Sequence, residues 1–366
     1  MKKKKVLIDL YSLENPNCGF GQIAVNYARL FAEVQRSGRE DFDIVFLLPF
    51  AFRKNHEDLS AFKGVKCYME ETRLHHIFHA IPNWLPKVDV WHSINQFCRR
   101  YPDRPSTRHI FTIHDYNFLF EDTEEQQKVF LEMMQQRIDR ADAVTFISHY
   151  TEQLVKEHSR LDGKLTRTIY NGVESLSDKP MSRPSFVVDD KPFFFAIGQF
   201  LPKKKFDVLL DMMKYLPDKN LFICGQNDFP YGQQIVKRIK EEQISNVIVP
   251  GSISNEERTW LFAHCEAYLF PSIGEGFGLP AIEAMQFGKP VFASTYQSLP
   301  EIVGTHGFIW PSLEPELMAQ TVKEHLDDFY AQPENGRAAA AYAASFSYEK
   351  HVEAYLQLYR ELLQTA

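Results

Sequence analysis

The sequence is short of paired cysteines, of surplus basic charge and of long apolar runs, and each shortage argues against a class of protein. Its five cysteines are scattered and form no C-x-x-C pair. That usage fits a reducing cytosol and neither a disulfide scaffold nor a zinc site. Lys and Arg number 41 against 48 for Asp and Glu, a formal charge of −7. A nucleic-acid-binding protein would carry a basic surplus, so no nucleic-acid partner is expected.

No stretch approaches the roughly 20 apolar residues that a membrane-spanning helix needs. Four lysines follow Met1, but the apolar run after them has only three residues before Asp9. A signal peptide would need at least about seven, so we expect a cytoplasmic protein. The acidic balance gives no support to wholesale adsorption on an anionic membrane, although a local basic patch would still permit contact.

What the chain does have is apolar and aromatic material, 44% and 14% of its 366 residues. At about 150 residues per domain, this length predicts two or three domains. Short apolar runs recur, each followed by a segment with helical spacing, and runs such as FFFAIG and LFICG do not alternate with polar residues. Such runs are typical of strands buried on both faces of a parallel sheet. The alternation, repeated twice, predicts two doubly wound, Rossmann-like α/β domains.

The boundary between these domains is expected within Ser175–Lys191, where prolines, serines and charges interrupt all periodicity. The first domain would then span residues 1–178 and the second residues 190–345. The last segment, Tyr348–Leu362, has an apolar face at helical spacing. A terminal amphipathic helix of this kind could pack on either domain.

The most informative stretch is PSIGEGFGLPAIEAM, residues 271–285, where a strand ends in a glycine-bracketed loop and a helix starts at once. Backbone N–H groups at a helix N-terminus form an anion site suited to a diphosphate. Glu275 lies in the loop, and Glu283 lies eight positions on, about two turns into the expected helix. Both carboxylates could accept hydrogen bonds from sugar hydroxyls. In the alternative, Glu275 only complements the helix dipole and Glu283 is solvated.

Three further features are weaker when taken from the residues alone. Lys203, Lys204 and Lys205 follow an expected strand, where they could stabilise a leaving phosphate or form a solvated turn. His114 ends another expected strand, at the edge where doubly wound folds bind ligands, although a lone histidine there is more often structural. Gly19-Phe20-Gly21 precedes an expected helix, and such a glycine pair is usually just a turn.

The sequence contains two possible metal motifs, but no bound metal is predicted. His75 and His79 have a spacing that can bind zinc, but no third ligand with suitable spacing is nearby. A helix that touches the acceptor or a membrane, or simple packing, are the alternatives for that segment. Asp41-Phe42-Asp43 resembles a D-x-D metal motif, but it precedes a strand near the N-terminus, so we interpret it as a strand-entry turn.

The segment EGFGLPAIE resembles the E-x7-E motif of the retaining GT-B glycosyltransferases, in particular family 4. Other matches to that family follow the same order along most of the chain. They are Gly19–Gly21, His114-Asp115, Tyr170–Val173, Ala196–Gly198, Lys203–Lys205, Leu299–Val303 and the closing FSYEKHVEAYLQLYREL. The resemblance implies a GT-B fold of two Rossmann-like domains facing across a cleft, with helix 348–366 packing back on the first.

The resemblance also assigns roles to residues. It places Glu275 on the donor sugar and Glu283 on the ribose hydroxyls, and it makes His114 a catalytic-site residue that contacts the donor sugar. It also makes Lys205, which matches the family's phosphate-binding lysine, a catalytic residue. The remaining donor-binding positions that it implies are Gly19, Gly21, Gln199, Lys204, Phe277, Gly278 and Leu279. Gln199 stands where the family usually has an arginine.

The resemblance implies a retaining hexosyltransferase that uses a nucleoside-diphosphate sugar, without a metal and without a covalent nucleophile. GDP- or UDP-hexoses are the expected donors, with mannosyl slightly favoured by the stretch SLPEIVG. A saccharide or lipid-linked saccharide would be the acceptor, and peripheral contact with the inner face of the membrane is an expectation from the family. The alternatives are another GT-B enzyme, such as an epimerase, and a non-catalytic nucleotide-sugar-binding subunit, which the departure at Gln199 motivates.

Overall fold

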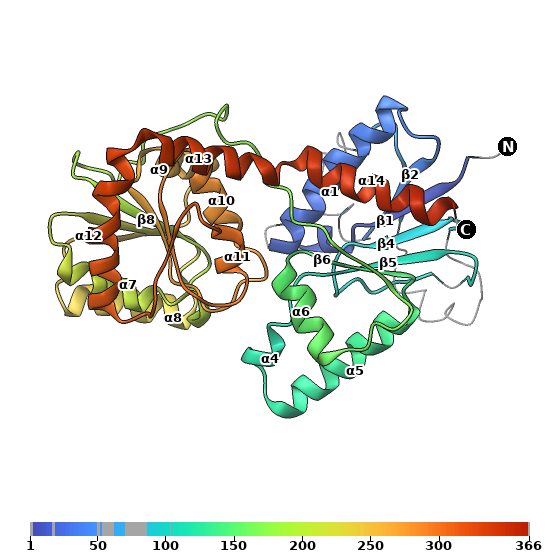
Figure 1. Ribbon diagram of the computed structural model, residues 1–366, viewed down its shortest axis with the longest axis horizontal. Coiled ribbons are helices and arrows are strands. Elements are labelled where there is room, and N and C mark those ends of the chain that lie inside the picture. The colour runs from blue at the N-terminus through green and yellow to red at the C-terminus, as the bar shows by residue number, and fades with distance from the viewer. Residues whose placement is uncertain are drawn as a thin grey trace. The chain divides into compact units, whose positions relative to one another are not determined.

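The computed structural model describes residues 3–16, 19–49, 52, 62–69, 86–102 and 104–364. His75 and His79, with the zinc-like spacing, lie outside the described residues. Internal contacts divide the chain into two units, residues 1–170 together with 348–366, and residues 171–347 (Figure 1). Within the ranges described, no helix is both long and apolar enough to cross a membrane.

The first unit contains a parallel sheet, whose described strands follow the order β3-β2-β1-β4-β5-β6-β7. These strands are β1 (Lys5–Asp9), β2 (Asp43–Leu48), β3 (Lys66–Met69), β4 (Val90–Ser93), β5 (Arg108–Ile113), β6 (Ala143–Phe146) and β7 (Leu165–Thr168). Its main described helices are α1 (Gly19–Ser37), α4 (Phe118–Glu121), α5 (Glu124–Arg140), α6 (His149–His158) and α14 (Tyr348–Gln364).

The second unit is also a parallel sheet, with the strand order β10-β9-β8-β11-β12-β13. Its strands are β8 (Phe193–Ile197), β9 (Asn220–Cys224), β10 (Val247–Gly251), β11 (Ala267–Phe270), β12 (Val291–Ala293) and β13 (Phe308–Ile309). Its helices are α7 (Phe206–Met212), α8 (Pro230–Glu241), α9 (Asn255–His264), α10 (Leu279–Gln286), α11 (Leu299–Val303), α12 (Pro315–Ala331) and α13 (Pro333–Ala343). Two doubly wound α/β units confirm the predicted fold class.

Burial explains why the strand runs of the second unit do not alternate. Phe194 and Phe195 are neighbours in β8, so their side chains leave opposite faces of the sheet, and both are fully buried. Helices must therefore cover both faces, as a parallel sheet requires. At the start of α9, Ser254 and Glu257 form a reciprocal capping box.

The last helix, α14, belongs to the first unit (Figure 1). It carries buried polar groups into the core of that unit. The Tyr359 hydroxyl lies 2.7 Å from His92 Nδ1, and the other ring nitrogen of His92 lies 2.9 Å from Thr112 Oγ1. About two turns earlier in α14, His351 Nε2 accepts from the Tyr27 hydroxyl at 2.9 Å, while its Nδ1 donates to a backbone carbonyl. The apolar spacing of this helix did not show which domain it packs on. These hydrogen bonds show that it packs on the first unit.

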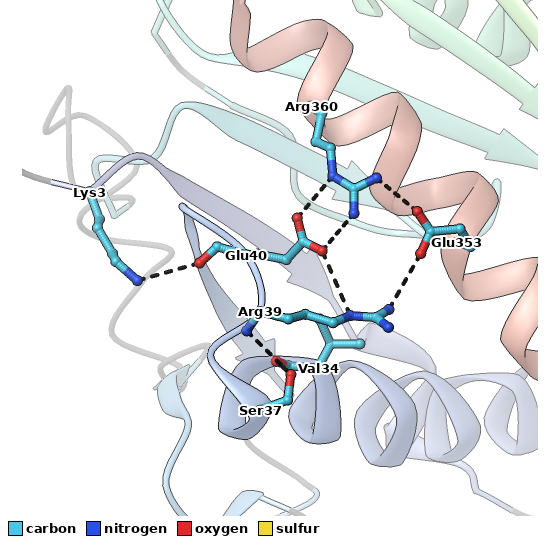
Figure 2. Close-up of polar contacts among 7 residues, drawn as sticks. All are labelled: Lys3, Val34, Ser37, Arg39, Glu40, Glu353 and Arg360. Atoms are coloured by element: carbon cyan, nitrogen blue, oxygen red, sulfur yellow. Dashed lines mark hydrogen bonds and ion pairs between the residues drawn. The ribbon is translucent and has the colours of Figure 1, made fainter.

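Ion pairs reinforce the same attachment at the surface (Figure 2). The Glu40 carboxylate, only 7% exposed, accepts from Arg360 Nε at 3.0 Å and from Arg360 Nη2 at 2.6 Å. Glu353 lies about two turns before Arg360 on the same face of α14 and accepts from the same guanidinium at 2.8 Å, while Arg39 pairs with both carboxylates. Because two arginines and two carboxylates share one network, α14 is held against the end of α1 by more than a single surface pair.

Residues 171–178, which the sequence analysis assigned to the first domain, lie in the second unit. The Leu176 N–H donates to the side chain of Gln286 at 2.8 Å, and the Val173 N–H donates to the Phe346 carbonyl at 2.7 Å. Both partners belong to the second unit, so the change of unit comes directly after Tyr170 and before the Ser175–Lys191 segment.

Candidate functional site

Two loops of the second unit meet at the carboxyl ends of neighbouring strands, β8 and β11. In the sheet, β8 lies between β9 and β11. The chain places β9 and β10 on one side of β8 and the later strands β11, β12 and β13 on the other. Open α/β sheets bind ligands at such a switch point. The loops contact each other directly, since the Lys203 carbonyl accepts from the Ile273 N–H at 2.8 Å and from Ser272 Oγ at 3.2 Å.

The helix that follows the second loop starts at a glycine in a left-handed conformation. Gly278 is the N-cap of α10 with φ of +112°, and an added Cβ would lie 2.8 Å from Leu299 Cδ2. In the first turn Pro280 has no N–H, and the Ala281 N–H donates to the Gly278 carbonyl at 3.0 Å. The Leu279 amide therefore remains at the positive end of the helix. Glu283 is the fifth residue of α10, just beyond the first turn, and not about two turns into a helix as the sequence suggested.

Gly278→Ala is therefore expected to destabilise the second unit by about 1–3 kcal/mol, because it adds backbone strain and a clash with Leu299. Urea unfolding monitored in the second unit would measure this change. Gly163→Ala, at a left-handed glycine with open space around it in the first unit, is the control that adds strain without the clash. Equal losses in the two variants would contradict the role assigned to the close contact.

Glu275 forms an ion pair across the two loops. Its Oε1 lies 2.5 Å from Lys204 Nζ, and each side chain is 15% exposed. The Lys204 ammonium also lies 5.7 Å from the centre of the Phe270 ring. The loop backbone is fixed from the other side, since Ser298 Oγ donates to the carbonyls of Glu275 and Phe277. Glu275 and Lys204 thus lie together at the switch point.

Phe277 contributes to this site only through its backbone. Its side chain is buried and packs edge-on against Phe346, with ring centres 5.8 Å apart. A ring held in the core cannot turn toward a ligand. The donor binding predicted for Phe277 would therefore come from its backbone amide. The same holds for Leu279 at the start of the helix.

The three consecutive lysines are not equivalent. Lys205 takes a left-handed conformation, with φ of +51°, and its Nζ lies 3.9 Å from Asp207 at the start of α7. The stem of Lys203 packs against Gly274, and an added Cβ there would lie 3.0 Å from Lys203 Cδ. Lys204 is the one of these three that pairs with Glu275. Gln199, at the start of the same loop, is exposed.

Glu283 is largely buried, with 13% of its side chain exposed, so the alternative of a solvated Glu283 is wrong. Its Oε1 pairs with Nη2 of Arg258 from α9. Burial raises the pKa of this carboxyl above its ordinary value, the Arg258 charge opposes that rise, and Glu174 adds to it. No pattern in the sequence indicates Arg258, because it lies 25 residues before Glu283 and in a different helix.

In the first unit, His114 directly follows β5 and is 4% exposed. Its Nε2 lies 2.8 Å from the Ile94 carbonyl, which can only accept, so the proton is assigned to Nε2 and Nδ1 is left as an acceptor. Burial lowers the pKa of His114 to about 4, which keeps the ring neutral at pH 7. Gln96, which sequence reasoning missed, accepts from the His114 backbone N–H at 3.1 Å.

Gly19 and Gly21 differ in what surrounds them. A Cβ on Gly21 would lie 1.9 Å from the Asn15 carbonyl oxygen, so packing of the chain on itself already requires glycine there. A Cβ on Gly19, the first residue of α1, would meet nothing within 4 Å. Of the two, only Gly19 has the open space that a ligand would need for a close approach.

Among the residues that the structure describes, no three His, Cys, Asp or Glu side chains gather in a way that could hold a metal ion. Asp43 is the first residue of β2, which is the strand-entry position predicted for the D-x-D-like sequence.

Two family models match consecutive parts of the chain. Residues 62–175 match the model described as Glycosyltransferase Family 4, and residues 178–345 match the model described as Glycosyl transferases group 1. An uncharacterized glycosyltransferase of Methanocaldococcus jannaschii is 26% identical over 70% of this chain and 69% of its own length. The O-antigen chain mannosyltransferase RfbU of Salmonella typhimurium is 27% identical over 59% of this chain and 60% of its own.

Solved structures show the same fold at lower identity. Sucrose-phosphate synthase from Thermosynechococcus elongatus superposes with a TM-score of 0.75 at 19% identity, covering 100% of both chains. Anabaena HepE, in complex with UDP and glucose, gives a TM-score of 0.71 at 18% identity and covers 98% of this chain and 99% of its own. At this identity the likeness concerns the fold.

Proposed function

Because the chain belongs to glycosyltransferase family 4 of the GT-B fold, we propose that it transfers a hexosyl unit from a nucleoside-diphosphate sugar to an acceptor hydroxyl with retention of configuration. The observation that carries this proposal is the arrangement at the switch point of the second unit. There a helix N-terminus, a Lys204–Glu275 pair and the buried carboxylate of Glu283 follow adjacent strands. The solved structure of HepE with UDP and glucose supports a nucleotide-sugar donor, and relatives named mannosyltransferases favour mannose.

The nucleotide would bind through two kinds of group. The amides of Gly278 and Leu279, at the start of α10, would donate to the diphosphate at the end of the helix that favours anions. The carboxylate of Glu283 would accept from the ribose diol, since an ionised carboxylate offers acceptor sites to both hydroxyls. Arg258 occupies only Oε1, which leaves Oε2 for this purpose.

Transfer breaks the bond between the sugar C1 and the diphosphate oxygen, and the electron pair leaves with the diphosphate. Lys204 and Lys205 would stabilise the charge that develops on this leaving group. The departing phosphate oxygen would take the proton of the acceptor hydroxyl, whose oxygen forms the new bond to C1. His114, neutral and with Nδ1 free to accept, would bind a hydroxyl of the donor sugar, as would Glu275. The acceptor would be a saccharide, either free or lipid-linked.

Glu283→Gln is expected to weaken nucleotide binding by about tenfold to a hundredfold, because a neutral amide replaces a charged acceptor. Isothermal titration calorimetry with GDP, UDP and ADP, with and without EDTA, would identify the base and measure the loss. Glu316→Gln, at an exposed position in α12, is the matched control. Unchanged affinity in Glu283→Gln would overturn the assignment of Glu283.

The same titrations separate this function from its alternatives. A transferase should bind one nucleotide and form a glycoside product from the matching sugar donor, detectable by mass spectrometry. Nucleotide binding without turnover of any donor would favour the non-catalytic binding subunit that Gln199 motivates. A changed sugar configuration without an acceptor product would favour an epimerase.

A further inference from the structure

We propose that Arg258 is a positioning residue for the donor site, holding Glu283 as an oriented carboxylate with one oxygen free for the nucleotide ribose. This inference rests on the proposed function, because it concerns how Glu283 is prepared for a nucleotide. The inference goes beyond the proposed function by adding Arg258, a residue of α9 that lies outside the two loops of the site.

The first argument is that, among the residues that the structure describes, Glu283 is the one polar partner of the Arg258 side chain. Arg258 Nη2 bonds Glu283 Oε1, and the Arg258 side chain is only 29% exposed. Its Nε is buried and has no hydrogen-bond partner among the described residues. An arginine that leaves a buried donor unpaired gives up stability. The guanidinium is therefore placed to serve Glu283, and a wider network does not explain its position.

The second argument is that Arg258 gains nothing from its own helix. It is the fourth residue of α9, near the end where the helix dipole is positive. Cations stabilise the opposite end of a helix, and carboxylates stabilise this one. The two acidic residues before it, Glu256 and Glu257, already suit that end, so the local sequence does not account for an arginine at this position.

The third argument is the charge environment of Glu283. From α9 it faces Arg258, from the segment after β7 it faces Glu174, and from β11 it faces Tyr268. Glu174 is itself paired with Lys179 at 2.7 Å. Tyr268 is buried, and burial raises its pKa, so it carries no charge at neutral pH. Arg258 is thus the cation among these groups that keeps a buried carboxylate ionised.

The fourth argument is geometric. A carboxylate has two oxygens, and a guanidinium often binds both of them in a bidentate pair. Here Arg258 is bonded to one oxygen only. That geometry holds Oε1 and leaves both acceptor sites of Oε2 for hydroxyls, whereas a bidentate pair would occupy one of them.

The test replaces Arg258 with methionine and with lysine and measures the affinity for GDP, UDP and ADP by calorimetry between about pH 6 and pH 9. In Arg258→Met, the pKa of Glu283 should rise further, because the charge that opposes the effect of burial is gone. A smaller fraction of Glu283 is then ionised, so affinity for the nucleotide that wild type binds should fall by about tenfold near pH 7. It should recover toward the wild-type value near pH 9, as Glu283 ionises. Arg258→Lys keeps the charge and should follow the wild-type profile.

The matched control is Lys219→Ala, which removes a half-buried ion pair of the same unit at the amino ends of the strands. Lys219 Nζ lies 3.0 Å from Glu266 Oε1, and the two side chains are 21% and 29% exposed. This variant should show the wild-type profile. The double variant Arg258→Met/Glu283→Gln should bind weakly at every pH, because the titrating group is gone. Circular dichroism at each pH checks that the variants are folded.

Wild-type affinity in Arg258→Met at every pH would overturn the inference and leave the proposed function intact. So would a uniform loss without recovery at high pH, since that would indicate a structural role alone. Absence of binding of all three nucleotides to the wild-type protein would overturn the proposed function and this inference with it.

Discussion

Replacing His114 with alanine is expected to lower kcat for glycosyl transfer by about a hundredfold or more, while nucleotide affinity changes by less than about threefold. His114 presents a neutral Nδ1 acceptor, since its Nε2–H is donated to the Ile94 carbonyl. In our proposal it binds the sugar that reacts, whereas Glu283 and the amides at the start of α10, proposed to bind the nucleotide, belong to the second unit. Steady-state kinetics and calorimetry would measure the two effects separately.

His158→Ala provides the control for this experiment, because it removes an exposed histidine at the end of α6 in the same unit. That variant should retain wild-type kcat. His114→Asn, which keeps a polar side chain, tests whether the loss comes from the cavity left by the ring. A proportional loss of nucleotide affinity in His114→Ala would contradict the separate roles, and an unchanged kcat would remove His114 from the reaction.

Acidification from pH 7 to pH 5 is expected to destabilise the first unit by several kcal/mol. Burial lowers the pKa of His109, His114 and His351 to about 4 and that of His92 well below its ordinary value. In the unfolded chain these groups titrate near 6.5, so between pH 6.5 and pH 4 the unfolded state binds more protons. Their contribution is fully present above pH 6.5 and is lost progressively as pH falls toward 4. At pH 5 the loss is about 2 kcal/mol for each of the three with a pKa of about 4.

Hydrogen–deuterium exchange with peptide resolution would measure this loss for each unit, after correction for the intrinsic exchange rate at each pH. Protection should fall in β4 and β5 of the first unit. His351→Gln should reduce the pH dependence, because a glutamine can still bond the Tyr170 carbonyl and the Tyr27 hydroxyl but cannot titrate. Equal protection of β4 and β5 at pH 7 and pH 5 would contradict the expectation.

The fold was predictable from the sequence because its strongest signal is burial. Runs such as FFFAI have no polar partner to alternate with, and only a sheet covered on both faces accommodates them. The strand β3 was missed because it is a short edge strand, KCYM, with an exposed lysine and half-buried neighbours. Edge strands need little apolar surface, so their sequences lack the pattern that reveals central strands.

The site was predictable only as far as its local motifs reach. Glu275 and Glu283 flank the start of one helix, so their spacing carries information. Arg258 and Gln96 act on residues that fold beside them from other elements, and no pattern along the chain marks such pairs. The sequence also could not show that the three lysines have different contacts. The left-handed conformation of Lys205 determines where each ammonium lies.

The placement of α14 in the first unit has a consequence for how the chain is made. Residues 171–347 are continuous in sequence and form the second unit, so this unit can fold as soon as it leaves the ribosome. The first unit must wait, because Tyr355 and Tyr359, which fill its core, are synthesised after every residue of the second. Until then His92 lacks the hydroxyl partner that Tyr359 provides, and the apolar face that α14 will cover stays open to solvent. The first unit is therefore completed after the second.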